Sequence, residues 1–121
     1  MKLFFALHPL LQLILTDASF YCYSNDMDFT LTATKTTVKE DISEGRESST
    51  HRDGRAADGS VKKWNETQRK NFRDFIEITY GHYGALMKDG SRKILIFHDA
   101  GSGDHWHLQL DRTFTYSAER S

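Results

Sequence analysis

The chain has 121 residues, of which 27% are charged and 38% are apolar, and its formal net charge is -1. This balance predicts one globular domain over residues 1–121 and excludes a chain that is disordered throughout. The near-zero charge argues against nucleic acid as the main partner, because binding to phosphates needs a basic surface. Cys22 is the only cysteine, so no internal disulfide can form, which fits a reducing compartment.

Residues 1–23 are rich in apolar side chains and predict an N-terminal helix. Pro9 suits the first turn of this helix, which we expect to continue to about Ala18. A cleaved signal peptide is the alternative, but polar residues interrupt the apolar run and no clear cleavage site follows it. The run is also too short to span a bilayer. We therefore expect a core-packing helix with Cys22 as a buried thiol.

Residues 29–34 alternate in polarity and are rich in β-favouring side chains, so they predict a strand. Residues 35–50 are polar and charged, with a glycine among them, and predict a loop. This loop is either a plain solvated connection or a substrate-side loop that delivers Lys35 or Arg46. These two basic residues are the candidates for substrate binding.

The clearest helix pattern runs from Trp64 to Tyr80. Asn65 can cap its first turn, and Gln68, three residues later, completes a capping-box pattern. Apolar side chains recur on one face at a spacing of 3.6 residues, which predicts packing against the core rather than a cofactor site.

The last part of the chain predicts a β-hairpin and a tail. Residues 92–98 and 105–110 read as two antiparallel strands joined by a glycine-containing loop. Residues 111–121 are polar and are expected to fray. Together the elements predict an α+β fold, in which a small antiparallel sheet packs against two or three helices.

Two short stretches hold residue types that are suited to chemistry. The first contains His51 and Asp58, which are too far apart for one helical face, so two strands, or a strand and a loop, should bring them together. The second contains Asp104, His105 and His107. On a strand the two histidines face one way and the tryptophan between them faces the other. Neutral imidazole and carboxylate are suitable zinc ligands.

The first stretch resembles the SxHxxGxAxD signature of the LAS-type zinc peptidases. These are the D-alanyl-D-alanine metallopeptidases and the phage L-alanyl-D-glutamate endopeptidases, relatives of the hedgehog fold. The matching residues are Ser49, His51, Gly54, Ala56 and Asp58. The second signature of the family is an acidic residue three positions before the last zinc histidine, and Asp104 and His107 match it in the expected order.

The resemblance implies a hedgehog-like fold in which His51, Asp58 and His107 bind zinc. It implies Asp104 as the general base that acts on a water molecule. His105 would lie beside the metal, where it stabilises the transition state. In such a site zinc lowers the pKa of its bound water to about 7 and polarises the scissile carbonyl.

Two features depart from the family pattern. Gly59 follows the zinc aspartate, where the family usually has an apolar residue. The family also tends to have an arginine upstream of the first zinc histidine, near the substrate carbonyl. Lys35 and Arg46 both lie upstream here, and a lysine would offer a point charge rather than a planar fork.

The function that the resemblance implies is zinc-dependent hydrolysis of a peptidoglycan peptide. The enzyme would be a D-alanyl-D-alanine carboxypeptidase or an L-alanyl-D-glutamate endopeptidase, such as a phage endolysin. We expect a cytoplasmic monomer without a membrane span, made in the host cytoplasm if a phage encodes it, that acts on the cell wall. The alternatives are a non-catalytic zinc module that binds wall peptide or belongs to a virion, and another hydrolase or a nuclease. The near-neutral charge disfavours a nuclease.

Overall fold

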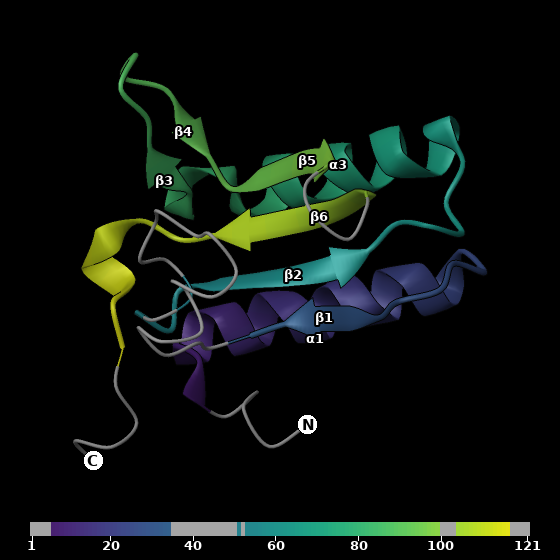
Figure 1. Ribbon diagram of the computed structural model, residues 1–121, viewed down its shortest axis with the longest axis horizontal. Coiled ribbons are helices and arrows are strands. Elements are labelled where there is room, and N and C mark those ends of the chain that lie inside the picture. Colours follow the sequence, from purple (N-terminus) through teal and green to yellow (C-terminus); the bar gives the residue numbers. More distant parts are fainter. Residues whose placement is uncertain (1–5, 35–50, 52, 100–103, 117–121) are drawn as a thin grey trace.

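The computed structural model describes residues 6–34, 51, 53–99 and 104–116, with the side chains of residues 98 and 99 left aside. Within these residues an antiparallel four-stranded sheet has the order β1-β2-β6-β5, and α1 and α3 lie together behind it (Figure 1). A two-stranded sheet, β3-β4, lies beside the larger one. The helices and strands are α1 Pro9–Ser24, β1 Leu31–Ala33, β2 Ala56–Ser60, α3 Glu66–Tyr80, β3 Ala85–Leu86, β4 Arg92–Lys93, β5 Leu95–Asp99 and β6 Asp104–Gln109. Short 3-10 helices cover Gly81–Tyr83 (η2) and Arg112–Phe114 (η3). The predicted α+β class is confirmed.

Helix α1 packs one apolar face against the sheet. Pro9 occupies its first turn, and the Nδ1 atom of His8 accepts a hydrogen bond from the backbone N–H of Leu10 at 3.0 Å. The buried residues are Leu11, Ile14, Leu15, Ala18 and Cys22. Because this helical spacing continues past Ala18, the helix runs to Ser24, six residues further than the sequence predicted.

Burial protects the thiol of Cys22. The side chain is fully buried, which raises its pKa to about 12, with a smaller contribution from the charge of Asp28. We expect a disulfide reagent at pH 8 to modify the folded protein about 1,000-fold more slowly than the urea-unfolded protein, since each pKa unit lowers the thiolate fraction tenfold. The raised pKa also predicts a contribution to stability that is complete below pH 9 and is lost as pH rises toward 12. Equal rates with and without urea would contradict the burial.

Helix α3 begins with the predicted capping box. The Asn65 side chain accepts from the backbone N–H of Gln68 at 2.8 Å, and the Gln68 side chain accepts from that of Asn65 at 2.9 Å. Phe72 and Ile76 are fully buried on the inner face. At the other end, the Tyr80 hydroxyl donates to Asp17 of α1 at 2.5 Å, which fixes the two helices to each other.

The helix side of the sheet is organised around Trp106. Its side chain is fully buried, its ring stacks on Phe29 at a centroid distance of 5.6 Å, and it also contacts Phe72. Gly59 lies directly opposite Trp106 across β2 and β6. A Cβ atom at Gly59 would overlap the indole ring, so the space that an apolar side chain would fill after Asp58 is already taken by the indole.

One sequence prediction about the C-terminal part is wrong, and a second, that residues 111–121 fray, does not hold for the described residues 111–116. The expected strand over residues 92–98 is interrupted at Ile94, because β4 pairs with β3 while β5 pairs with β6. Gly84 lies so close to the interruption at Ile94 that a Cβ atom on Gly84 would be 2.6 Å from the Ile94 backbone nitrogen. The tail does not fray directly after β6. Residues 112–114 form η3, and the Tyr116 N–H donates to the Asp53 carbonyl at 2.7 Å, because this segment packs beside the turn before β2.

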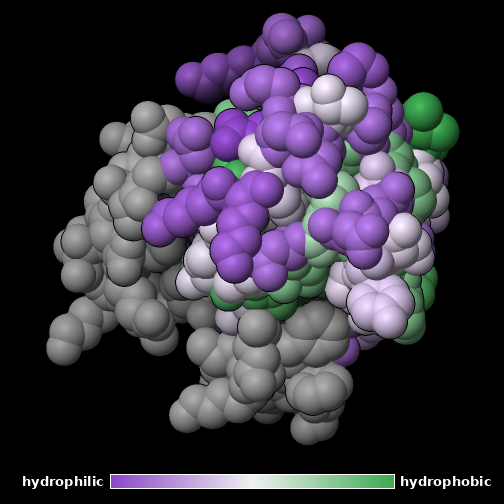
Figure 2. All heavy atoms as spheres, turned by 90° about the vertical axis from the view of Figure 1, so that its right-hand side faces the viewer, coloured by the Kyte–Doolittle hydropathy of each residue, from purple (hydrophilic) through white to green (hydrophobic). Residues whose placement is uncertain are grey.

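One side of the molecule has a mainly polar described surface. Figure 2 shows the side that lies on the right in Figure 1, where hydrophilic side chains cover most of the described area. The large apolar side chains that remain exposed are Leu13, Phe20, Tyr23, Ile78, Leu86 and Met87. Among the described helices, none combines the length and the apolar character that crossing a membrane requires.

Candidate metal centre

The pairing of β2 with β6 places Asp58, His105 and His107 on the side of the sheet that faces away from the helices. Asp58 lies directly opposite His107, and Ser60 lies opposite His105. Because side chains alternate along a strand, His105 and His107 share this side while Trp106 points into the core. The predicted alternation of this stretch is confirmed.

A tight turn brings His51 to the same place. The backbone N–H of Gly54 donates to the His51 carbonyl at 3.1 Å, and Gly54 has a positive φ of 69°. A Cβ at Gly54 would lie 2.9 Å from the Tyr116 carbonyl oxygen and 3.0 Å from that of Ala6, so this position needs glycine for both conformation and space. The turn therefore depends on the glycine that the sequence motif contains.

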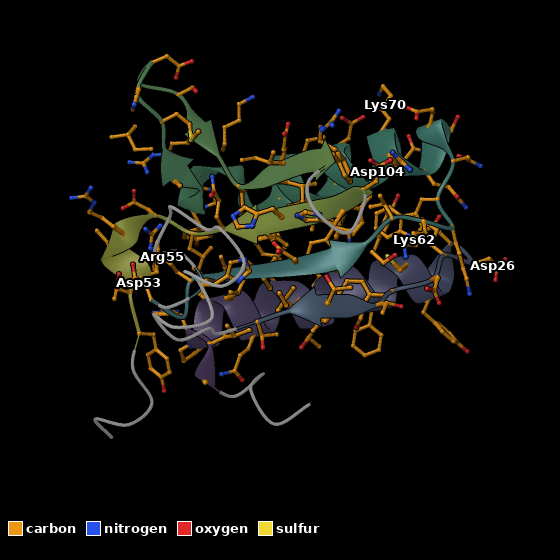
Figure 3. The ribbon with its side chains drawn as sticks, viewed as in Figure 1. Asp26, Asp53, Arg55, Lys62, Lys70 and Asp104 are labelled. Carbon is orange, nitrogen blue, oxygen red and sulfur yellow. The ribbon has the colours of Figure 1, made fainter. Side chains whose placement is uncertain are left out.

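Charged side chains hold this turn against the end of β6. Arg55 donates from Nη1 to the Leu110 carbonyl at 2.8 Å and from Nε to the Asp53 carboxylate at 3.3 Å. Both charged residues are labelled beside the start of β2 in Figure 3. His51 is thus fixed relative to the two strands that carry Asp58 and His107.

Three side chains converge into one group that could hold a metal ion. His51, Asp58 and His107 each offer a ligand atom, and these atoms all lie within 4.8 Å of one another. The His51 Nε2 atom is 3.3 Å from Asp58 Oδ2, and the His107 Nδ1 atom is 2.6 Å from Asp58 Oδ1. Two ligands of a tetrahedral zinc lie about 3.3 Å apart, so the group has the size of a zinc site. The sequence named all three of these residues.

The contact of the second ring nitrogen of His51, Nδ1, shows which of its two nitrogens carries the proton. Nδ1 lies 2.8 Å from the carbonyl oxygen of Thr34, which can only accept a hydrogen bond. Nδ1 must therefore carry the proton, and in neutral His51 the lone pair sits on Nε2 and faces the Asp58 carboxylate. Two acceptors at such a distance need a proton or a metal ion between them. A ligand histidine whose other nitrogen donates to a carbonyl is typical of metal sites.

Asp58 supplies a negative charge at the centre of the group. Burial by itself would raise its pKa, but hydrogen bonds and charges from His107 and His51 hold the pKa well below its ordinary value. The carboxylate is therefore ionised at neutral pH although Asp58 is only 7% exposed. A buried anion between two imidazoles is a suitable site for a cation.

His105 lies at the edge of this group and Asp104 lies outside it. The His105 Nε2 atom is 3.8 Å from Asp58 Oδ2. Asp104 is the first residue of β6, and alternation gives it the orientation of Trp106 rather than that of the histidines. Its carboxylate is 3.5 Å from Arg69 Nη1 on α3 (Figure 3). The structure thus does not bring Asp104 to the metal group, and its role as a base stays a prediction.

The two substrate-binding candidates, Lys35 and Arg46, lie outside the described residues.

The sequence analysis missed a side chain that contacts the site, that of Gln109, which lies 3.0 Å from the His107 ring. Its position two residues after His107 on a strand, and so on the same side of the sheet, is the signal that could have found it.

Comparisons with known proteins found no relative of this chain. No protein-family model, curated protein or solved structure matches the chain. The residues themselves and the resemblance of the two motifs are therefore what indicate a function.

Proposed function

We propose that the chain is a zinc-dependent peptidase of the LAS type, with a hedgehog-like fold, that hydrolyses a peptide bond of peptidoglycan. The observation that carries this proposal is the convergence of His51, Asp58 and His107 at ligand distances, from the positions that the two motifs give to zinc ligands. Zinc held there would lower the pKa of a bound water to about 7 and polarise a carbonyl.

The exposure of the side chains indicates the side from which a substrate arrives. The His51 side chain is 3% exposed, whereas those of His107 and His105 are 13% and 16% exposed. We therefore expect a peptide to approach from the β6 side, over the two histidines. The short distance from His105 Nε2 to Asp58 Oδ2, 3.8 Å, supports the stabilising role expected of His105, in which it would donate a hydrogen bond to the oxyanion of the substrate.

The biological setting belongs to the same proposal. We infer a monomer that acts on the cell wall after synthesis in the cytoplasm, which is the host's if the chain comes from a phage. The substrate is a wall peptide that contains D-amino acids. Only the motif resemblance supports this setting.

A second candidate is a zinc module that binds wall peptide or forms part of a virion without turnover. The position of His105, 3.8 Å from Asp58, favours it, because a fourth protein ligand would close the site as in structural zinc centres. The contact of Asp104 with Arg69 also favours it, since the carboxylate is turned away from the group. The two candidates share the metal and differ in catalysis.

Zinc content and hydrolysis, measured side by side, separate the candidates. Elemental analysis of the purified protein should give one zinc per chain, and incubation with purified peptidoglycan should release new amino groups. Zinc without release of amino groups would favour the binding module. A protein without zinc after loading with excess Zn²⁺ would refute both candidates.

Replacing Asp104 tests the base assignment. If Asp104 leaves Arg69 and accepts a proton during the reaction, Asp104→Asn should lower the hydrolysis rate by about 10²- to 10⁴-fold and leave zinc binding unchanged. If Asp104 serves only its exposed ion pair, the rate should stay the same and stability should fall by about 1 kcal/mol or less. Arg69→Leu is the matched control, because it removes the ion pair but keeps the carboxylate.

A further inference from the structure

Gln109 is a buried polar residue on the metal side of β6 to which the proposed chemistry gives no role. It is 7% exposed, and its amide lies between the metal group and the smaller sheet. The Oε1 atom is 3.0 Å from His107 Nε2. The Nε2 atom is 3.1 Å from the backbone carbonyl of Lys93 in β4 and 3.9 Å from the sulfur of Met87.

The Lys93 carbonyl decides which way the Gln109 amide is turned. A backbone carbonyl only accepts hydrogen bonds, so the amide nitrogen must face Lys93 and donate to it. The amide oxygen is then the atom that faces His107. Because this oxygen also only accepts, the Nε2 atom of His107 must carry a proton and donate to it.

This hydrogen bond determines which nitrogen of His107 is available to a metal. When Nε2 carries the proton, Nδ1 is the nitrogen left to bind a metal. In the metal-free structure Nδ1 lies 2.6 Å from Asp58 Oδ1, which is a hydrogen-bond distance, and a metal ion would replace that hydrogen bond. Gln109 therefore does for His107 what the Thr34 carbonyl does for His51. In both histidines the nitrogen that faces Asp58 is therefore the one that a metal ion would take, and a metal ion bound by both would replace their contacts with the carboxylate.

We propose that Gln109 is a positioning residue, which fixes the tautomer and orientation of His107 and so sets the metal affinity of the site. The inference rests on the proposed function only through zinc binding, not through hydrolysis. It also gives the β3-β4 sheet a function, because the Lys93 carbonyl of that sheet holds the amide. The support for His51 is a backbone carbonyl, which no substitution removes, so Gln109 is the point at which this support is testable.

The decisive comparison is between Gln109→Leu and Gln109→Glu. Leucine fills similar space without an acceptor, so zinc affinity, measured by competition with a chromophoric chelator, should fall by about 10- to 100-fold. Glutamate keeps an acceptor for the His107 N–H and makes it stronger, so affinity should equal or exceed that of the wild type. Gln12→Leu is the matched control, because Gln12 lies on α1 and its side chain donates to the Leu7 carbonyl.

In urea, the stability of the two metal-free variants should rank in the reverse of their zinc affinities, with Gln109→Leu more stable than Gln109→Glu. Glutamate places a buried negative charge against the Lys93 carbonyl, so Gln109→Glu should be the least stable variant, while Gln109→Leu leaves only neutral groups unpaired. A residue that merely supports the fold would make zinc affinity follow stability. In the zinc-loaded wild type, the His107 Nε2 proton should also give a slowly exchanging imidazole signal by NMR, which should disappear in Gln109→Leu.

The outcomes separate this inference from the proposed function. Failure of the wild type to bind Zn²⁺ overturns both of them. Wild-type binding with an unchanged affinity in Gln109→Leu overturns the role of Gln109 and leaves the metal site in place. An affinity order of wild type, leucine and then glutamate, parallel to stability, also overturns that role. Weaker binding by leucine together with full binding by glutamate supports it, whatever the hydrolysis rate.

Discussion

Replacing His51 with alanine is expected to abolish stoichiometric zinc binding and to reduce peptidoglycan hydrolysis to the uncatalysed background. His51 is 3% exposed and its Nδ1 atom lies 2.8 Å from the Thr34 carbonyl, so alanine would leave this buried ligand position empty. Loss of an outer-shell partner typically weakens metal binding by 10- to 100-fold, and loss of a direct ligand should exceed that range. Chelator competition and amino-group release measure the two effects on the same samples.

His82→Ala is the matched control for this substitution. His82 is exposed on η2, where its ring contacts that of Tyr83 at a tilt of 41°, and it lies outside the metal group. We expect it to leave zinc content and hydrolysis unchanged. If His51→Ala retained one tightly bound zinc, the assignment of the ligands would be wrong. Retention of hydrolysis without zinc would refute the metallopeptidase proposal itself.

Gly59→Ala is expected to destabilise the fold by about 3 kcal/mol or more, at the upper end of the usual cost of overpacking. The added methyl would overlap the indole of Trp106, which is fully buried between Phe29 and Phe72 and so has little space into which to move. Because Gly59 follows Asp58 on β2, any shift of the strand should also weaken zinc binding. Urea unfolding of the metal-free protein measures the loss of stability.

Gly81→Ala provides the control for this second prediction. Gly81 ends α3 with helical dihedral angles, and among the described residues no atom outside its own helical turn lies within 4 Å of the position that a Cβ would take. Alanine at this position should be neutral, or should stabilise the fold by about 0.4 to 1 kcal/mol, because it reduces the freedom of the unfolded chain. Equal midpoints for Gly59→Ala and the wild type would show that Trp106 can move aside.

Local sequence signals were sufficient for the start of α3, for the alternation along β6 and for the three residues of the group that could hold a metal ion. The side chains of Asn65 and Gln68 cap α3 because capping involves residues only three apart. Alternation placed His105 and His107 on one side of β6, because the period of a strand does not depend on its neighbours. The resemblance to the family signature selected His51 and Asp58, and its glycine, Gly54, has the positive φ of the turn before β2.

The tertiary structure decided everything that depends on which segments meet. It supplied the Thr34 carbonyl for His51, directed Asp104 toward Arg69, and ended the strand at Ile94. It also placed Trp106 against Gly59. Each of these contacts joins residues distant in the chain or on different elements, and their pairing depends on how the helices and strands pack. The sequence by itself therefore determined which residue types the site contains and how they are spaced. The packing of the sheet determined which protons and charges face one another.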